Sequence, residues 1–234
     1  MFYGTPNWRE KLRGARRDCP VGDQCIVRSA CVQPDQVGVS TPPRLAKYAK
    51  HTLIGCHGGE GSFVFAIRKG LVAPFTLSET GRETILGLLG QGQMFGQGGL
   101  FAAEARPFAA LTCTEAELCR FPTRDLEELI KTDPKLAERV IGSLADSLWE
   151  AARQLEIQNQ PLARNRIRAL LESAAGQLGG QLEEGGLPLT HEQLAYMAGV
   201  NRVTVTRALR ELEEEGFVRR ERGRVQVVIA PKAK

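Results

Sequence analysis

The alternation of apolar and polar positions divides the chain into a strand-rich stretch followed by a helix-rich stretch. From about residue 51 to residue 122, short apolar runs such as "SFVFAIRKG" and "LVAPFTLSETG" are each closed by a turn that contains glycine. Short strands at regular spacing with glycine turns are typical of an antiparallel roll or barrel. We therefore expect a β-roll over residues 51–132, preceded in residues 1–50 by a cysteine-rich segment and a proline-containing connector.

A long helix is predicted to begin after Asp133. The stretch "DPKLAERVIGSLADSLWEAARQLEIQN" opens with Asp-Pro, a common helix start, and apolar residues then recur every three or four positions. They form one narrow seam: Val140, Leu144, Leu148, Ala151 and Leu155. Such a seam favours a two-helix coil and hence a homodimer, and the alternative is that it packs on the chain's own roll. We assign residues 133–160 to a dimerisation helix.

The stretch "LTHEQLAYMAGVNRVTVTRALRELEEEGFVRRERGRVQVVI" predicts a winged helix-turn-helix. Thr190 can cap a short helix, Gly199 makes the turn, and Asn201 can cap a second helix that ends at Gly216. The residues after Gly216 alternate into two short strands around a basic turn. We assign residues 161–234 to this DNA-binding domain, and the fold class as a whole is α+β.

The second helix of this motif has one apolar and one polar face. Val205, Leu209 and Leu212 recur at helical spacing and should pack inward. The opposite face carries arginine and threonine, which suit base edges and phosphates. The residues expected to contact DNA are Thr190, His191, Arg202, Val203, Thr204, Thr206 and Arg207. Phosphate contacts are expected from four arginines of the wing, Arg219, Arg220, Arg222 and Arg224. The alternative is a surface helix with solvated charges, which the two caps, the turn glycine and the basic wing together disfavour.

Composition adds limits rather than an identity. The 234 residues carry a net charge of +4, which permits nucleic-acid binding without requiring it. No apolar run is long enough to span a membrane, and the N-terminus lacks a signal peptide's apolar stretch, so we expect a cytoplasmic protein with no membrane partner. We find no nucleophile–base pair, phosphate loop or HExxH helix, and therefore expect no enzyme activity.

Three of the six cysteines lie within "CPVGDQCIVRSAC", at Cys19, Cys25 and Cys31. In a reducing compartment such a group indicates a metal or redox site before a structural disulfide. An iron–sulfur cluster, a zinc site and a thiol–disulfide switch all remain open from spacing alone. We expect Cys56 and Cys113 to be small buried residues of the roll.

From residue 19 to residue 230 the chain resembles the CRP/FNR superfamily of bacterial transcription regulators. The glycine-rich roll, the long helix and the winged helix-turn-helix are the basis of the resemblance. It implies a sensor roll, a dimerisation helix and a domain that binds two-fold symmetric promoter sites, with RNA polymerase as a further partner. Arg202 and Arg207 match the family's Arg-Glu-Thr-Val-Ser-Arg pattern. Val203 replaces its acidic residue, as in the nitrogen-control branch, and cannot accept a hydrogen bond from cytosine.

Within the family the cysteines resemble the oxygen-sensing FNR branch, which holds a [4Fe–4S] cluster on three N-terminal cysteines and one in the roll. Cys25 and Cys31 match the last two N-terminal ligands, and Cys119 in "AELCRFPTRDL" matches the fourth. Cys19 stands five residues ahead of Cys25, where the branch has a gap of two, but a loop of this length still reaches one cluster. The resemblance therefore implies a [4Fe–4S] cofactor on Cys19, Cys25, Cys31 and Cys119.

Two further departures bear on the signal. Gln97 stands where the cyclic-nucleotide branch has its ribose-binding Glu, and Pro107 stands where that branch has Ser, so cyclic-nucleotide binding is not expected. Ala151 aligns with an Asp that opposes pairing of the dimer helix in the FNR branch. The resemblance therefore implies that the cluster-free protein pairs more readily here.

Overall fold

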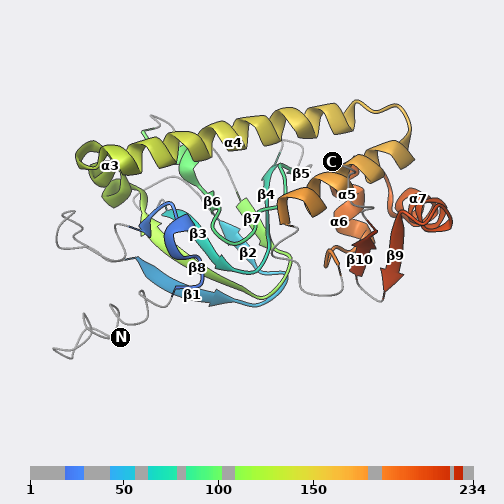
Figure 1. Ribbon diagram of the computed structural model, residues 1–234, viewed down its shortest axis with the longest axis horizontal. Coiled ribbons are helices and arrows are strands. Elements are labelled where there is room, and N and C mark those ends of the chain that lie inside the picture. Colours follow the sequence, from blue (N-terminus) through green and yellow to red (C-terminus); the bar gives the residue numbers. More distant parts are fainter. Residues whose placement is uncertain are drawn as a thin grey trace, which may run out of the picture.

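The computed structural model shows a β-roll and a winged DNA-binding domain joined by one long helix that runs along the side of the molecule (Figure 1). The α+β fold class, the antiparallel roll and the C-terminal helix-turn-helix are confirmed. None of the helices in the described part of the chain has the length and hydropathy needed to cross a bilayer. The structure describes residues 19–28, 43–55, 63–77, 83–101, 109–178, 186–221 and 224–228.

Two four-stranded antiparallel sheets form the roll. The first contains, in spatial order, β1 (Arg44–Tyr48), β8 (Ala116–Pro122), β3 (Phe63–Lys69) and β6 (Met94–Phe95). The second contains β2 (Leu53–Gly55), β7 (Ala109–Thr112), β4 (Val72–Leu77) and β5 (Glu83–Ile85). The roll therefore begins at Arg44, inside the stretch expected to be a connector. Among the described strands β1 lies at the edge of its sheet, next to β8, and its side chains are largely exposed. It therefore lacks the apolar pattern that predicts a strand.

Alternation along the strands gives each sheet two buried faces. On β3, Phe65 and Ile67 point between the sheets, where the ring of Phe65 stacks on that of Phe95 with centroids 4.9 Å apart. Val64 and Ala66 point to the opposite face, into a second core. That second core covers the outside of the first sheet.

Three parts of the chain cover the outside of the first sheet. They are the described cysteine segment (residues 19–28), which contains η1 (Gly22–Gln24), helix α3 (Thr123–Thr132) and the start of α4 (Pro134–Gln158). Helix α3 lies in the range 51–132, where a roll made of strands is predicted. Its Leu126 and Leu129 are buried in the second core. The predicted helix start at Asp133 is confirmed, since its Oδ1 accepts from the backbone N–H groups of Lys135 and Leu136 at 3.1 and 3.2 Å.

The exposed seam of α4 differs from the prediction by one position. Val140 is only 4% exposed and packs in the second core against the roll, so its assignment to a dimer seam is wrong. Ile141, at 65% exposed, takes its place. The exposed positions then follow a regular spacing of three and four: Ile141, Leu144, Leu148, Ala151 and Leu155. Successive positions of a helix are about 100° apart around its axis, so Val140 points toward the roll while its neighbour Ile141 points toward solvent.

The outside of the second sheet packs on the DNA-binding domain. Phe75 and Ile85 of the roll belong to the same core as Leu194 and Leu209 of the helix-turn-helix. The elements of that domain are α5 (Ala163–Leu178), α6 (His191–Ala198), α7 (Arg202–Glu214), β9 (Val218–Glu221) and β10 (Arg224–Val227). Helix α5 opens the range assigned to the DNA-binding domain, and the two predicted wing strands are β9 and β10.

Candidate cysteine site and DNA-binding face

Strand β8 places Cys119 on the outer face of the first sheet. Leu118 points between the sheets, whereas Cys119 and Phe121 belong to the core that the cysteine segment covers. Cys25 is buried in that core, and Cys19 is partly buried against it. Three of the four predicted ligands thus belong to one core, although Cys119 is distant in sequence from the other two. Cys31 lies outside the described residues.

The cysteine segment is compact. The N–H of Gly22 donates to the carbonyl of Cys19 at 3.0 Å, and the N–H of Cys25 donates to the carbonyl of Gly22 at 3.3 Å. Gly22 has a φ of +56°, a left-handed conformation that favours glycine. These turns bring Cys19 and Cys25 to the same side of the first sheet.

Side chains from two other parts of the chain hold this segment. Gln91, in the loop before β6, donates from Nε2 to the carbonyl of Pro20 at 3.0 Å. Arg139 of α4 donates from Nη1 to the carbonyl of Cys25 at 3.1 Å. Val21 and Val27, which belong to the segment, are buried in the core that it covers. The segment is therefore attached both to the roll and to the long helix.

The surroundings of Cys25 act on its thiol in opposite directions. Burial raises the pKa of Cys25, and the nearby Cys19 raises it further, whereas the N–H of Val27 and the charges of Arg28 and Arg139 lower it. Among the described residues, no three His, Cys, Asp or Glu side chains are gathered closely enough to hold a single metal ion.

Cys113 belongs to a different core. It is fully buried on the side of the second sheet that packs on the DNA-binding domain, as expected for a small core residue. Gln193 of α6 donates to its sulfur at 3.5 Å, and burial raises the pKa of its thiol to about 12. Cys113 therefore does not share the core of Cys119, and Cys56 lies outside the described residues.

The helix-turn-helix has both predicted caps. The hydroxyl of Thr190 accepts from the N–H of Gln193 at 3.1 Å, and the side chain of Gln193 accepts from the N–H of Thr190 at 2.9 Å. Gly199 turns the chain with a φ of +63°. Asn201 Oδ1 accepts from the N–H of Thr204 at 2.8 Å and from its hydroxyl at 2.9 Å. Thr204 was predicted to contact DNA, and in this structure its hydroxyl belongs to the cap.

The predicted recognition face of α7 is exposed, and Val205, Leu209 and Leu212 are buried behind it. Val203 is 70% exposed, and the side chain of Thr206 lies 3.0 Å from Nδ1 of His191 on α6. The exposed predicted DNA contacts on this helix are Arg202, Val203, Thr206 and Arg207.

Of the two wing arginines whose side chains are described, one forms an ion pair within the motif. Arg220 pairs with Glu213 of α7, with its Nε 2.6 Å from Oε2, whereas Arg219 is exposed. Arg222 and the side chain of Arg224 are outside the described part of the structure. His191 is also affected, because partial burial, and then the charges of Arg202 and Arg220, lower its pKa below 6.5.

A cavity of about 760 Å³ lies beside the contact between the roll and the DNA-binding domain and is lined by residues of both. Phe75 and Leu111 line its apolar side, and His191, Arg202 and Arg220 line its polar side. The first residues of both helices of the motif therefore face the roll, a placement that local sequence patterns do not indicate.

Gln97 connects the roll to α4. It is buried, and its Nε2 donates to the hydroxyl of Ser147 at 3.1 Å, while its Oε1 has no hydrogen-bond partner among the described residues. Its amide thus stands where the cyclic-nucleotide branch has a carboxylate. Pro107 lies outside the described residues.

Comparison with known proteins agrees with this architecture. Residues 45–133 match the cyclic nucleotide-binding domain, and residues 166–232 match the Crp-like helix-turn-helix domain. The cyclic AMP receptor protein of Thermus thermophilus is 34% identical over 171 residues, which are 73% of this chain and 77% of that protein. The transcriptional activator protein FnrL of Cereibacter sphaeroides is 25% identical over 223 residues, which cover 91% of this chain and 86% of that protein.

Among solved structures, FixK2 from Bradyrhizobium japonicum superposes with a TM-score of 0.68 at 19% identity, over 80% of this chain and 93% of that one. It supports the fold alone, whereas the two domain matches and the 34% identical relative also define the family. The chain belongs to the CRP/FNR superfamily of DNA-binding transcription regulators.

Proposed function

We propose that this regulator senses oxygen or redox state through a [4Fe–4S] cluster on Cys19, Cys25, Cys31 and Cys119, and binds two-fold symmetric promoter sites as a homodimer. The observation on which this rests is the side of β8 from which Cys119 emerges, because it is the side that the Cys19–Cys25 segment covers. Successive side chains of a strand point to opposite faces of the sheet. A thiol at the preceding position, Leu118, would therefore point between the two sheets, away from the cysteine segment.

The extent of the match to FnrL supports a role for the N-terminal segment. That match leaves less than a tenth of this chain uncovered, whereas residues 1–43 alone make up almost a fifth of it. It therefore extends into the segment ahead of the roll. The match to the cyclic AMP receptor protein covers only 73% of this chain.

The ligand set suits a thiolate-bound cofactor. When bound, a [4Fe–4S] cluster supplies a group that oxygen converts or dismantles. Thiolates also suit zinc, but a single zinc ion needs its ligands gathered tightly around one point. A cluster of four irons lets its cysteines stand farther apart. The metal content of the purified protein tells the two cofactors apart.

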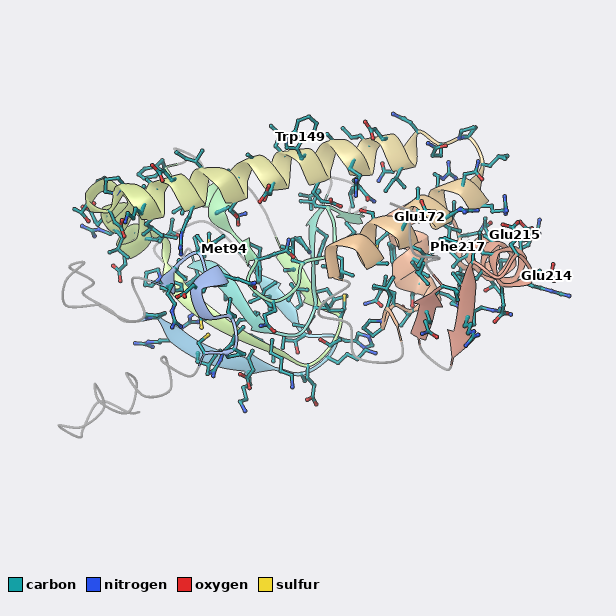
Figure 2. The ribbon with its side chains drawn as sticks, viewed as in Figure 1. Met94, Trp149, Glu172, Glu214, Glu215 and Phe217 are labelled. Carbon is teal, nitrogen blue, oxygen red and sulfur yellow. The ribbon has the colours of Figure 1, made fainter. Side chains whose placement is uncertain are left out.

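The exposed seam of α4 supports the homodimer. Ile141, Leu148 and Leu155 are each more than 60% exposed, and their spacing is that of a coiled coil. Trp149 is 76% exposed beside the seam, and Figure 2 shows it on the side of α4 that faces away from the roll. A second copy of α4 would bury this face, and two recognition helices related by a two-fold axis would match a two-fold symmetric site.

A small ligand in the roll is the second candidate, which the similarity to the cyclic AMP receptor protein favours. The amide of Gln97 argues against a cyclic nucleotide, because the ribose-binding carboxylate of that branch is replaced by a group already bonded to Ser147.

DNA selection from a random pool tests the proposal. Anaerobically purified protein, air-exposed protein and protein with added cyclic AMP would each select DNA, and the bound pools would be sequenced. We expect a two-fold symmetric motif from the anaerobic protein, weakened by air and unaffected by cyclic AMP. A motif that appears only with cyclic AMP would refute the cluster proposal, and equal enrichment with and without air would refute redox sensing.

A further inference from the structure

One hydrogen bond connects the cysteine segment directly to the long helix. Arg139 Nη1 donates to the carbonyl oxygen of Cys25 at 3.1 Å. A second side-chain hydrogen bond to this segment, from Gln91 to the carbonyl of Pro20, comes from the roll. The two bonds have the same kind of acceptor but join the segment to different bodies.

Arg139 lies on α4 directly before a residue of the core and a residue of the exposed seam. The next residue, Val140, is buried in the same core as Cys25, and the one after it, Ile141, is the first residue of the exposed seam. A helix is a rigid element, so a displacement at Arg139 reorients the start of the seam.

There is room for such a displacement. A cavity of about 970 Å³ lies between the cysteine segment, the loop before β6 and α4, and Arg139 lines it together with Asp23, Gln93 and Ser143. The guanidinium can therefore leave the carbonyl of Cys25 without displacing the buried core beneath it.

We infer that Arg139 is a positioning residue that transmits the state of the cysteine segment to α4. The inference rests on the proposed function. A ligand held by the thiol of Cys25 fixes the orientation of the adjacent carbonyl, and Arg139 then holds α4 against the segment. When the ligand is lost, the segment relaxes, the bond to Arg139 is weakened, and the start of the seam is held less firmly against the roll.

The test compares Arg139→Met, which removes the donors, and Arg139→Lys, which keeps a charged donor, with the matched control Gln91→Ala. For each protein the iron content and the ratio of DNA affinities before and after air exposure would be measured. We expect Arg139→Met to bind iron like the wild type but to lose about fivefold or more of that affinity ratio. Arg139→Lys should restore part of the ratio, and Gln91→Ala should retain it.

Hydrogen exchange of metal-free protein provides a readout that does not depend on the cluster. Arg139→Met should speed exchange both in residues 19–28 and in the first turns of α4, whereas Gln91→Ala should affect residues 19–28 only. A wild-type protein without iron refutes the proposed function, and the exchange pattern then decides the contact separately. Arg139→Met with normal iron and an unchanged affinity ratio would overturn the inference, as would unchanged exchange in α4.

Discussion

Single side chains decide which groups can act together in this molecule. Cys119 and Cys113 are six positions apart in sequence, yet one lies in the core beneath the cysteine segment and the other lies against α6. The caps at Thr190 and Asn201 set where the two helices of the DNA-binding motif begin, and so determine which side chains α7 exposes.

The cap of the recognition helix is open to a direct test. Replacing Asn201 with Ala removes the acceptor for the N–H of Thr204, and should lower the free energy of unfolding by about 1 kcal/mol. Urea denaturation measures this loss. Asn201→Asp keeps an acceptor and should lose much less, so equal losses in the two variants would contradict the capping role.

The pH dependence of stability should contain a contribution from His191. Its pKa in the folded protein is lowered, chiefly by burial, so below 6.5 the unfolded chain takes up a proton that the folded chain does not. Stability is therefore fully present above 6.5 and falls as the pH decreases from there through the folded pKa. Urea denaturation of the wild type and His191→Gln at about pH 7.5 and about pH 5.5 should show a smaller loss in the variant. Equal losses would show that His191 does not contribute.

At the scale of whole elements, α4 has two separate tasks. Its inner face, with Leu136 and Val140, covers the roll and the cysteine segment, while its outer face exposes an apolar seam. The two faces predict different consequences of mutation, because one is buried within a single chain and the other would be buried only in the proposed homodimer.

A charge in the seam should separate the two tasks. Leu148 is 72% exposed, so Leu148→Glu should yield a folded monomer in sedimentation velocity. Lys135→Glu, which adds a carboxylate to the same helix outside the seam, should remain dimeric. A dimeric Leu148→Glu protein would place the interface elsewhere.

The inner face of α4 should respond differently. Leu136→Ala should lower the free energy of unfolding by about 2–5 kcal/mol, because Leu136 is buried in the core.

Sequence patterns predicted the elements whose signals are local. The Asp133 start, both caps, the turn glycine and the wing strands depend on neighbouring residues, and all are present. β1 and α3 were missed because β1 is largely exposed and α3 follows β8 without a break. Val140 was misassigned because periodicity cannot tell which side of a helix meets the roll. The contact from Arg139 to Cys25 joins residues 114 positions apart, and no local pattern contains it.

At the scale of the whole molecule, one helix contacts every functional part. Near its start α4 bonds to the cysteine segment through Arg139, in its middle to the roll through Ser147, and near its end to α6 through Gln154. The last bond runs from the buried Nε2 of Gln154 to the carbonyl of Met197 at 2.9 Å. A change at the cysteines can therefore reach the DNA-binding domain along a single rigid element.

Loss of the bond from Gln154 should loosen the DNA-binding domain. Gln154→Leu leaves the carbonyl of Met197 buried without that partner, which should cost about 1–3 kcal/mol. Hydrogen exchange should quicken in α6 while the roll is unaffected. Equal protection of α6 in the variant and the wild type would show that α4 does not hold this domain.

The most direct test of the central claim is the iron and sulfide content of anaerobically purified protein, with its visible spectrum before and after air. We expect about four irons per chain and a broad absorption band at about 400 nm that bleaches in air, both lost in Cys119→Ala and retained in Cys113→Ala. A colourless protein with one zinc, or with no metal, would contradict the cluster. Loss of the band in Cys113→Ala but not in Cys119→Ala would contradict the assignment of Cys119.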